Sequence, residues 1–348
     1  MKAAVLEKWR HLRVQEVETP TPAAGEVLIR VSQAGVCGSD VHIYNGDNPI
    51  ATTPVIQGHE FMGVVEELGE NVAGFSKGQR VAIQPLVFCG FCTSCQRDIP
   101  HVCEKLTVIG VNRNGAFAEY VAVPQDTLFA LAEDLPDKVG VLAEPFSIGY
   151  HACQRGSITA SDKVLVIGGG PIGFYSAITA RELGAQQVTL SEPLVERREL
   201  IASFDLQVVD PLVSTTLPEL QERTNSEGYD LVIETSGTTE GLEFASQAAA
   251  VGGRIVTLGF PAKNYAHYNI THGIVRELSL IGSRVCTRKQ FVQTLDLLTS
   301  LHRRSQYDLA TLVTDPKGLG ELSRSIDCLL YTSPSPRDAT LSRMPSSA

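Results

Sequence analysis

The second part of the chain alternates short apolar runs with stretches of helical length, and this alternation constrains the fold most. From Lys163 onward, the runs KVLVIG, QQVTLSE, DLVIETSG and GRIVTLGF are separated by stretches such as PIGFYSAITARELG and GLEFASQAAAVG. Buried strands that alternate with helices of this length predict a doubly wound, parallel α/β sheet. The first 150 residues instead carry short β-type runs broken by Gly and Pro, which predict a separate β-rich unit.

A glycine-rich turn follows the first of these strands and opens the next helix. It reads GGGPIG and matches the pattern GxGxxG. The first glycine permits a tight turn, the second lets a pyrophosphate approach the backbone, and the third lets the helix pack on the strand. The helix N-terminus adds free N–H groups and a positive dipole. The residues expected to form this dinucleotide site are Gly168, Gly170, Ile172 and Gly173.

Glu192 ends the next strand, nineteen residues after Gly173. A carboxylate there accepts the ribose hydroxyls of an adenosine and repels a 2′-phosphate, so the sequence favours NAD over NADP. Arg197 is suited either to lie against the adenine or to bind a phosphate, which keeps NADP open. The alternative for the whole motif is a glycine-rich loop that binds no ligand.

Four cysteines occur close together in the β-rich part, with the spacing Cys89-x2-Cys92-x2-Cys95-x7-Cys103. Four thiolates on one loop provide the ligands of a closed, structural zinc site. Ferredoxin-type iron–sulfur runs place the fourth cysteine after three residues and before proline, whereas seven residues precede Cys103. Structural zinc is therefore the expected ligand, with iron–sulfur or redox thiols as alternatives.

Length and charge limit the kinds of partner. A chain of 348 residues exceeds the roughly 250–300 residues that a single core supports, so we expect two domains. The formal net charge of −10 disfavours nucleic acid and anionic lipid. The opening sequence MKAAVLEKWRHLRVQEV does not look like a secretory signal, and no run approaches the ~18 apolar residues of a membrane span. We expect a cytoplasmic protein.

A second group of potential metal ligands is scattered along the chain. Cys37 lies in GVCGSDVH, His59 and Glu60 lie in GHE, and Glu144 lies in LAEPFSIGYHA. Taken singly, a buried cysteine or a solvated glutamate is ordinary. Together they supply the sulfur, nitrogen and oxygen ligands of a zinc site that keeps an exchangeable position.

These motifs, in this order and at these intervals, resemble those of zinc-containing medium-chain dehydrogenases of the alcohol dehydrogenase superfamily. The resemblance extends from the first strand to about Asp327. It implies a GroES-like catalytic domain, a Rossmann domain and an active site in the cleft between them. It also implies that Cys37, His59 and Glu144 bind catalytic zinc, while Glu60 alternates with water as a ligand or orients that water.

The resemblance further implies how the reaction proceeds. Zinc lowers the pKa of a substrate hydroxyl, and hydride passes to the nicotinamide. Ser39, two residues after the zinc cysteine, takes the hydroxyl proton, and His42 passes it to solvent. The alternatives are that Ser39 caps a loop and that His42 is a structural histidine.

The motifs disagree about the substrate. The segment Ala143-Glu144-Pro145 resembles the polyol and sugar-acid branch, which includes sorbitol, idonate and galactonate dehydrogenases. In contrast, DVHIYNG and GVNRNGAFAEYVAVP resemble L-threonine 3-dehydrogenase. We predict hydride transfer from a secondary alcohol of a polyol or sugar acid to NAD, with threonine oxidation as the alternative. The alternative of another class is an inactive protein that binds NAD and zinc. The resemblance also implies that the chain forms a homodimer or a homotetramer.

The expected domain boundaries follow from these patterns. Residues 1–150 form the first part of the catalytic domain, residues 151–285 the NAD-binding domain, and residues 286–328 return to the catalytic domain. The last stretch, 329–348, is rich in Ser and Pro and has no hydrophobic period. We expect this tail to be disordered and non-native.

Overall fold

The computed structural model describes residues 1–260, 267–314 and 317–331. The chain divides into two compact units, one made of Met1–Glu144 and Thr287–Ala348, the other of Pro145–Cys286. Helix α4 (Ala143–Arg155) spans the first boundary. Residues 145–150, which the sequence analysis assigns to the β-rich unit, therefore cluster with the second unit. No helix in the described part is both long and apolar enough to span a bilayer.

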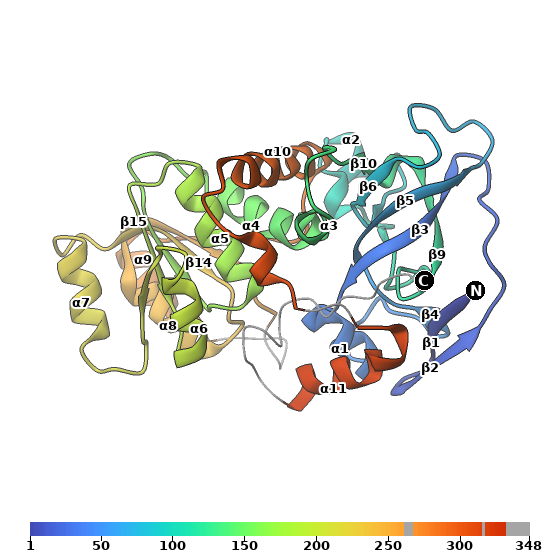
Figure 1. The fold of residues 1–348 in the computed structure, drawn as a ribbon. Coiled ribbons are helices and arrows are strands. Elements are labelled where there is room, and N and C mark those ends of the chain that lie inside the picture. The colour runs from blue at the N-terminus through green and yellow to red at the C-terminus, as the bar shows by residue number, and fades with distance from the viewer. Residues whose placement is uncertain (261–266, 315–316, 332–348) are drawn as a thin grey trace. The chain divides into compact units, whose positions relative to one another are not determined.

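Antiparallel strands form the framework of the first unit (Figure 1). Its five-stranded sheet has the order β10 (Leu128–Ala130), β6 (Arg80–Ile83), β5 (Glu60–Leu68), β3 (Glu26–Gly35) and β9 (Tyr120–Pro124). A three-stranded sheet has the order β2 (His11–Glu16), β1 (Lys2–Lys8) and β4 (Val55–Ile56), and β7 (Leu86–Val87) pairs with β8 (Thr107–Val108).

Short helices connect these strands, and two longer ones follow the second unit. The described α-helices of the first unit are α1 (Gly38–Asn45), α2 (Thr93–Gln96), α3 (Asp137–Gly140), α10 (Arg288–Arg304) and α11 (Leu322–Tyr331). Its 3-10 helices are η1 (Pro100–Val102), η2 (Gln125–Thr127), η3 (Leu309–Leu312) and η4 (Leu319–Glu321).

Apolar side chains from both sheets make the core of the first unit, and helix α11 contributes to it. Phe61 and Phe117 are fully buried there, and Leu322 and Ile326 of α11 belong to the same cluster. Helix α10 starts with a capping box, in which the Thr287 side chain accepts from the Gln290 amide. The predicted tail begins at Leu329, but α11 continues to Tyr331; residues 332–348 lie outside the described residues.

The second unit is a doubly wound parallel sheet, which confirms the predicted α/β class. Its strand order is β13 (Gln207–Val209), β12 (Gln187–Ser191), β11 (Lys163–Ile167), β14 (Tyr229–Glu234), β15 (Ala249–Thr257) and β16 (Ser279–Gly282). The helices that follow the strands are α5 (Pro171–Glu182), α6 (Val195–Ala202), α7 (Thr216–Arg223), α8 (Thr239–Ala248) and α9 (Ile270–Val275).

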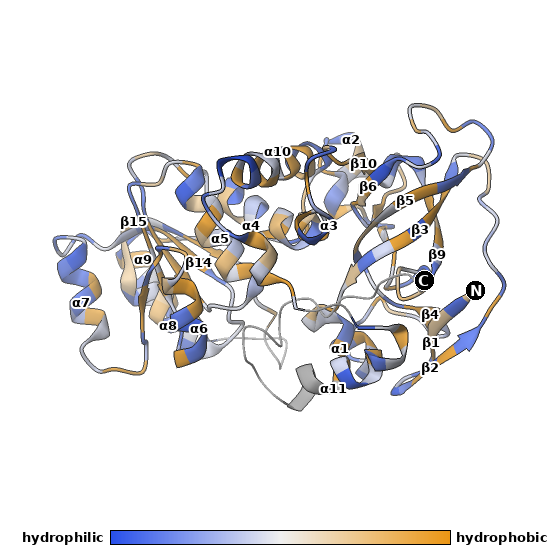
Figure 2. Cartoon of the chain, viewed as in Figure 1, coloured by the Kyte–Doolittle hydropathy of each residue, from blue (hydrophilic) through white to orange (hydrophobic). Residues whose placement is uncertain are grey.

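Sequence signals explain where these elements begin and what they bury. Helix α5 starts at Pro171, a residue whose fixed φ suits the first helical position. In α8, the Thr238 side chain accepts from the Gly241 amide and caps the helix. Strand β11 is almost entirely buried, as expected for a central parallel strand. Figure 2 shows α7 as largely hydrophilic, in keeping with its exposure.

Candidate active site and metal centres

Strand pairing brings the first group of predicted ligands together. Cys37 directly precedes α1, just after β3, and His59 directly precedes β5. Because β3 pairs with β5 and Gly35 lies opposite Glu60, the two segments end side by side. The Cys37 sulfur, a ring nitrogen of His59 and a carboxylate oxygen of Glu60 all lie within 4.8 Å of one another.

A buried carboxylate that the sequence analysis missed holds this cluster. Asp40 is fully buried, and its Oδ2 accepts from the Cys37 amide at 2.9 Å. Its Oδ1 lies 3.5 Å from Nδ1 of His59, although neither atom has a hydrogen bond. Asp40 therefore occupies the Nδ1 side of the His59 ring, and Nε2 is the nitrogen available to a metal, as in carboxylate–histidine pairs at zinc sites. The sequence signal that could have identified Asp40 is its place three residues after Cys37, the N-cap residue of α1.

The turn that carries His59 depends on two features of its neighbours. Gly58 has φ +96, and a Cβ there would meet the Phe117 ring at 2.7 Å. The Gln57 side-chain amide donates to the Asp40 carbonyl at 2.9 Å and so joins this turn to α1. A glycine is therefore required at position 58 for both conformation and space.

Glu144 lies in the first turn of α4 and is buried. It is not among the three residues whose ligand atoms lie within 4.8 Å of one another, but its carboxylate interacts electrostatically with His59, Glu60 and Asp40. The structure thus places all four predicted ligands in the first unit, with Glu144 beside the compact group.

The electrostatics of this group favour a bound cation. Burial raises the pKa of Glu60 to about 7, with His59 opposing the shift and Asp40 adding to it. Burial also raises the pKa of Glu144 to about 8; His59 opposes this shift, while Glu60 and Asp40 add to it. Burial raises the pKa of the Cys37 thiol too. A divalent cation would offset the cost of burying these anions, so the donors fit a zinc ion.

His59 responds differently from the acids. Burial lowers the pKa of its imidazole, but the neighbouring Asp40 and Cys37 outweigh burial, and the pKa lies well above its ordinary value. Ser39 is half-buried, with its Oγ 3.3 Å from Nε2 of His59. His42 lies one turn further along α1 and is exposed to solvent. The predicted proton-transfer residues are therefore on one short helix.

The four-cysteine loop converges around a common centre. The sulfur–sulfur distances include 3.5 Å for Cys92–Cys95 and Cys89–Cys103, 3.7 Å for Cys92–Cys103 and 4.0 Å for Cys89–Cys95. A tetrahedron with Zn–S bonds of about 2.3 Å has edges of about 3.8 Å, so the loop fits a four-thiolate zinc ion. Backbone amides stabilise the thiolates and lower the pKa of Cys92 to about 6.

In the second unit, the predicted dinucleotide residues lie around one turn. Gly168 has φ +95, and Gly170 is the residue at the N-terminal cap of α5, whose first turn includes Ile172. A Cβ at Gly173 would lie 1.9 Å from the Gly168 carbonyl oxygen, so only glycine allows α5 to approach β11 this closely.

Glu192, directly after β12, contacts this turn. Its Oε2 accepts from the Gly169 amide at 2.7 Å, and its Oε1 accepts from the Leu194 amide at 2.9 Å. The Arg197 guanidinium lies 3.4 Å from the same carboxylate. The predicted acid is therefore bound to the glycine-rich turn itself, and a cation partly neutralises it.

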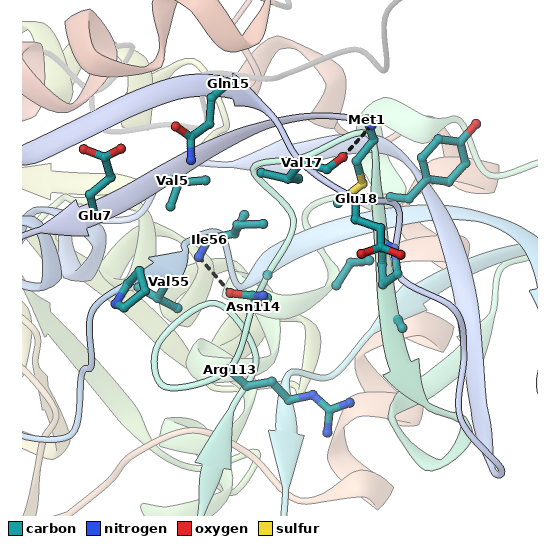
Figure 3. Close-up of a pocket in the computed structure, with 16 residues that line it drawn as sticks. Met1, Val5, Glu7, Gln15, Val17, Glu18, Val55, Ile56, Arg113 and Asn114 are labelled. Carbon is teal, nitrogen blue, oxygen red and sulfur yellow. Dashed lines mark hydrogen bonds between the residues drawn. The ribbon is translucent and has the colours of Figure 1, made fainter.

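A cavity of about 630 Å³ lies elsewhere in the first unit (Figure 3). Its walls include Val17, Ile56 and Arg113, and Asn114 accepts from the Ile56 amide at 3.0 Å. The predicted site residues do not line it. The cavity is thus separate from the metal-ligand clusters.

Two family models match the chain. An alcohol dehydrogenase GroES-like domain matches residues 23–133, and a zinc-binding dehydrogenase domain matches residues 171–300. The 2-dehydro-3-deoxy-L-galactonate 5-dehydrogenase of Pseudoalteromonas atlantica is 33% identical over 90% of each chain. The L-threonine 3-dehydrogenase of Deinococcus radiodurans is 32% identical, also over 90% of each. A solved alcohol dehydrogenase from Escherichia coli in complex with NADH is 30% identical, with a TM-score of 0.88 over 99% of each chain.

Replacing Cys92 by serine should remove one metal ion per chain. We expect about two zinc ions in the wild type and about one in the Cys92→Ser variant, together with a lower thermal midpoint. Elemental analysis of the purified protein measures this, and Ser94→Ala on the same loop serves as the control with unchanged zinc. An iron signal, or unchanged zinc in Cys92→Ser, would contradict the assignment.

The stability of the zinc-free protein should fall as pH rises. The pKa values of Glu60 and Glu144 are raised from 4.5 to about 7 and about 8, so the folded state holds protons that the unfolded state releases. The stability that these protons contribute is fully present below about pH 4.5 and is lost as the pH rises through the raised pKa values. We expect the free energy of unfolding to fall between about pH 5 and about pH 8, by up to about 1.4 kcal/mol per pH unit for each proton.

Urea unfolding after chelation measures this slope. Glu144→Gln cannot ionise, so its slope should be shallower than that of the wild type, while the four-cysteine loop is the same in both proteins. Zinc-saturated protein provides the second control, because the cation compensates the anions. Equal slopes in all three samples would contradict the electrostatic account.

Proposed function

The chain belongs to the zinc-containing medium-chain dehydrogenases, and we propose that it transfers a hydride from a secondary alcohol of a polyol or sugar acid to NAD. The family matches confirm the resemblance that the sequence motifs indicated. The observation that carries the proposal is the cluster of half-buried Cys37 with buried His59 and Glu60, with buried Glu144 beside it.

We assign catalytic zinc to Cys37, His59 and Glu144, with Glu60 as an exchangeable ligand or as the residue that orients water. When bound there, zinc supplies a Lewis acid for the substrate hydroxyl, and NAD is the hydride acceptor. The four-cysteine loop is assigned a structural zinc, because four thiolates leave no open position.

The remaining residues orient groups and move the proton. Asp40 positions the His59 ring through its Nδ1 side. Ser39, 3.3 Å from Nε2 of His59, accepts the hydroxyl proton, and exposed His42 passes it to solvent. Both assignments draw on the position of these residues on α1.

For the cofactor, the turn at Gly168, Gly170, Ile172 and Gly173 is proposed to bind the pyrophosphate. Glu192 is proposed to accept the adenosine ribose hydroxyls, which favours NAD. Arg197 lies against Glu192 and reduces its negative charge, so some binding of NADP is compatible with the site. Backbone amides at the start of α5 provide the anion-binding groups.

The relatives support two substrate classes. One is named a 2-dehydro-3-deoxy-L-galactonate 5-dehydrogenase and the other an L-threonine 3-dehydrogenase, at 33% and 32% identity. We place the sugar acid or polyol first because Glu144 is followed by Pro145, and threonine second. An inactive NAD- and zinc-binding protein is disfavoured, because each predicted ligand type lies in a buried cluster.

Activity assays distinguish these classes. Full-length protein should form NADH with at least one member of a panel of polyols and aldonates, and L-threonine should be the slower substrate. With the preferred substrate, Ser39→Ala should lower kcat by about 10²-fold or more, because the proton acceptor is lost. Asn48→Ala, outside the cluster, is the control. Zinc-loaded protein that reduces NAD with neither class would contradict the proposal.

We also propose a homodimer that pairs through β16. In the described residues, this strand has a partner, β15, on one side, so its other edge is open. Leu280 on β16 is 47% exposed, and on neighbouring α9 Ile274 and Val275 are 71% and 76% exposed. An unpaired strand edge beside exposed apolar side chains is typical of a surface that another chain covers.

Charge supports a twofold arrangement of two copies. If the β16 strands of two copies pair antiparallel about a point between Leu280 and Ile281, exposed Glu277 of each copy faces exposed Arg284 of the other.

The molecular mass from light scattering during size-exclusion chromatography should be that of two chains. Leu280→Lys and Glu277→Arg should lower the mass toward one chain, and Glu277→Arg with Arg284→Glu should restore it. Leu212→Lys, at a site 78% exposed, is the control; a monomeric wild type would contradict the proposal.

A further inference from the structure

The segment that follows β14 is hydrogen-bonded to the glycine-rich turn. The Thr235 hydroxyl lies 2.8 Å from the carbonyl oxygen of Ile167 and 3.1 Å from that of Gly168, and donates between them. The Thr235 amide also donates to Ile167, at 2.9 Å. Thr235 thus binds the last residue of β11 and the first residue of the turn.

Two glycines of the GxGxxG motif leave the space that this hydroxyl occupies. A Cβ at Gly168 would lie 2.7 Å from the Thr235 oxygen, and a Cβ at Gly173 would lie 2.8 Å from it. Both distances are shorter than side chains tolerate. The hydroxyl is therefore packed between the start of the turn and the first helical turn of α5.

Glu234 holds Thr235 from the other side. Its Oε1 accepts from the amides of Ser236 and Gly237, at 2.7 and 3.1 Å, and from the Ser236 hydroxyl. Its carbonyl accepts from the Leu258 amide of the neighbouring strand's loop at 3.1 Å. Glu234 is buried, whereas its partner Ser236 is exposed, so these bonds are part-buried. The position of Thr235 is fixed before a ligand binds.

We propose that Thr235 is a positioning residue for the cofactor pyrophosphate. By binding the carbonyls of Ile167 and Gly168, it fixes the start of the turn. The amides of Gly168 and Gly169 already donate to the Ser191 carbonyl and to Glu192, so the amides left for an anion are those in the first turn of α5, which follow from this fixed start. Preorganised amides bind an anion without a further ordering cost. This inference rests on the proposed function, in which the chain binds a dinucleotide. It adds Thr235, which lies outside the glycine-rich motif, to the residues that shape the pyrophosphate site.

The test compares ligands with and without a pyrophosphate. Thr235→Val keeps the shape and removes the hydroxyl, and it should weaken NADH and ADP-ribose by about three- to tenfold, as expected for one lost hydrogen bond. Adenosine, which has no phosphate, should bind as it does to the wild type. Thr235→Ser retains the hydroxyl and should restore the affinity for NADH to within about twofold.

Full-length protein is titrated with NADH by fluorescence, and the other two ligands compete against it. Thr189→Val removes a buried hydroxyl in the same sheet, bonded at 3.1 Å to Tyr229, and is the control that should lower stability without changing NADH affinity. If Thr235→Val does not fold, the NADH affinities of Thr235→Ala, which lacks the hydroxyl, and Thr235→Ser, which retains it, are compared instead.

Three results would overturn the inference. They are unchanged NADH affinity in a folded variant without the hydroxyl, an equal loss for adenosine and NADH, and failure of Thr235→Ser to restore affinity. A wild type that does not bind NADH would instead contradict the proposed cofactor, so the two failures are distinguishable.

Discussion

The antiparallel pairing of β3 with β5 is the constraint on which the candidate catalytic centre depends. It places Gly35 opposite Glu60 and so brings the Cys37 and His59 segments together. Buried Asp40 then binds the Cys37 amide and lies against the His59 ring. A slip of one residue in this register would turn the predicted ligands to opposite faces of the sheet, so the proposed metal site depends on the register of these two strands.

The two metal-ligand clusters solve different physical problems. The four-cysteine loop is local, with Cys92 and Cys103 buried and Cys89 and Cys95 half-buried. Its own backbone amides lower the pKa of Cys92. The group around His59 instead buries several acids, whose pKa values are raised mainly by burial and further by neighbouring negative charge. In the proposed assignment, a cation at the group around His59 would offset this negative charge and supply reactivity, whereas a cation at the four-cysteine loop would mainly hold that loop together.

In the parallel sheet, neighbouring strands act together on one turn. Glu192 after β12 and Thr235 after β14 lie on strands that flank β11, and both bind the glycine-rich turn that follows it. Ligand sites of such sheets lie at the carboxyl ends of the strands, where these segments meet. The turn is therefore held from both sides, and its glycines provide the room for these contacts.

Local spacing was sufficient to predict the glycine-rich turn, the four-cysteine loop and the alternation of strands and helices, because each is encoded within a short stretch of chain. The sequence also suggested Cys37, His59, Glu60 and Glu144 as a group, through family motifs. Only the tertiary structure identified Asp40 and Thr235. Their roles arise from contacts with residues that are distant in sequence or on a neighbouring strand, and such contacts depend on strand pairing and burial that no local pattern contains.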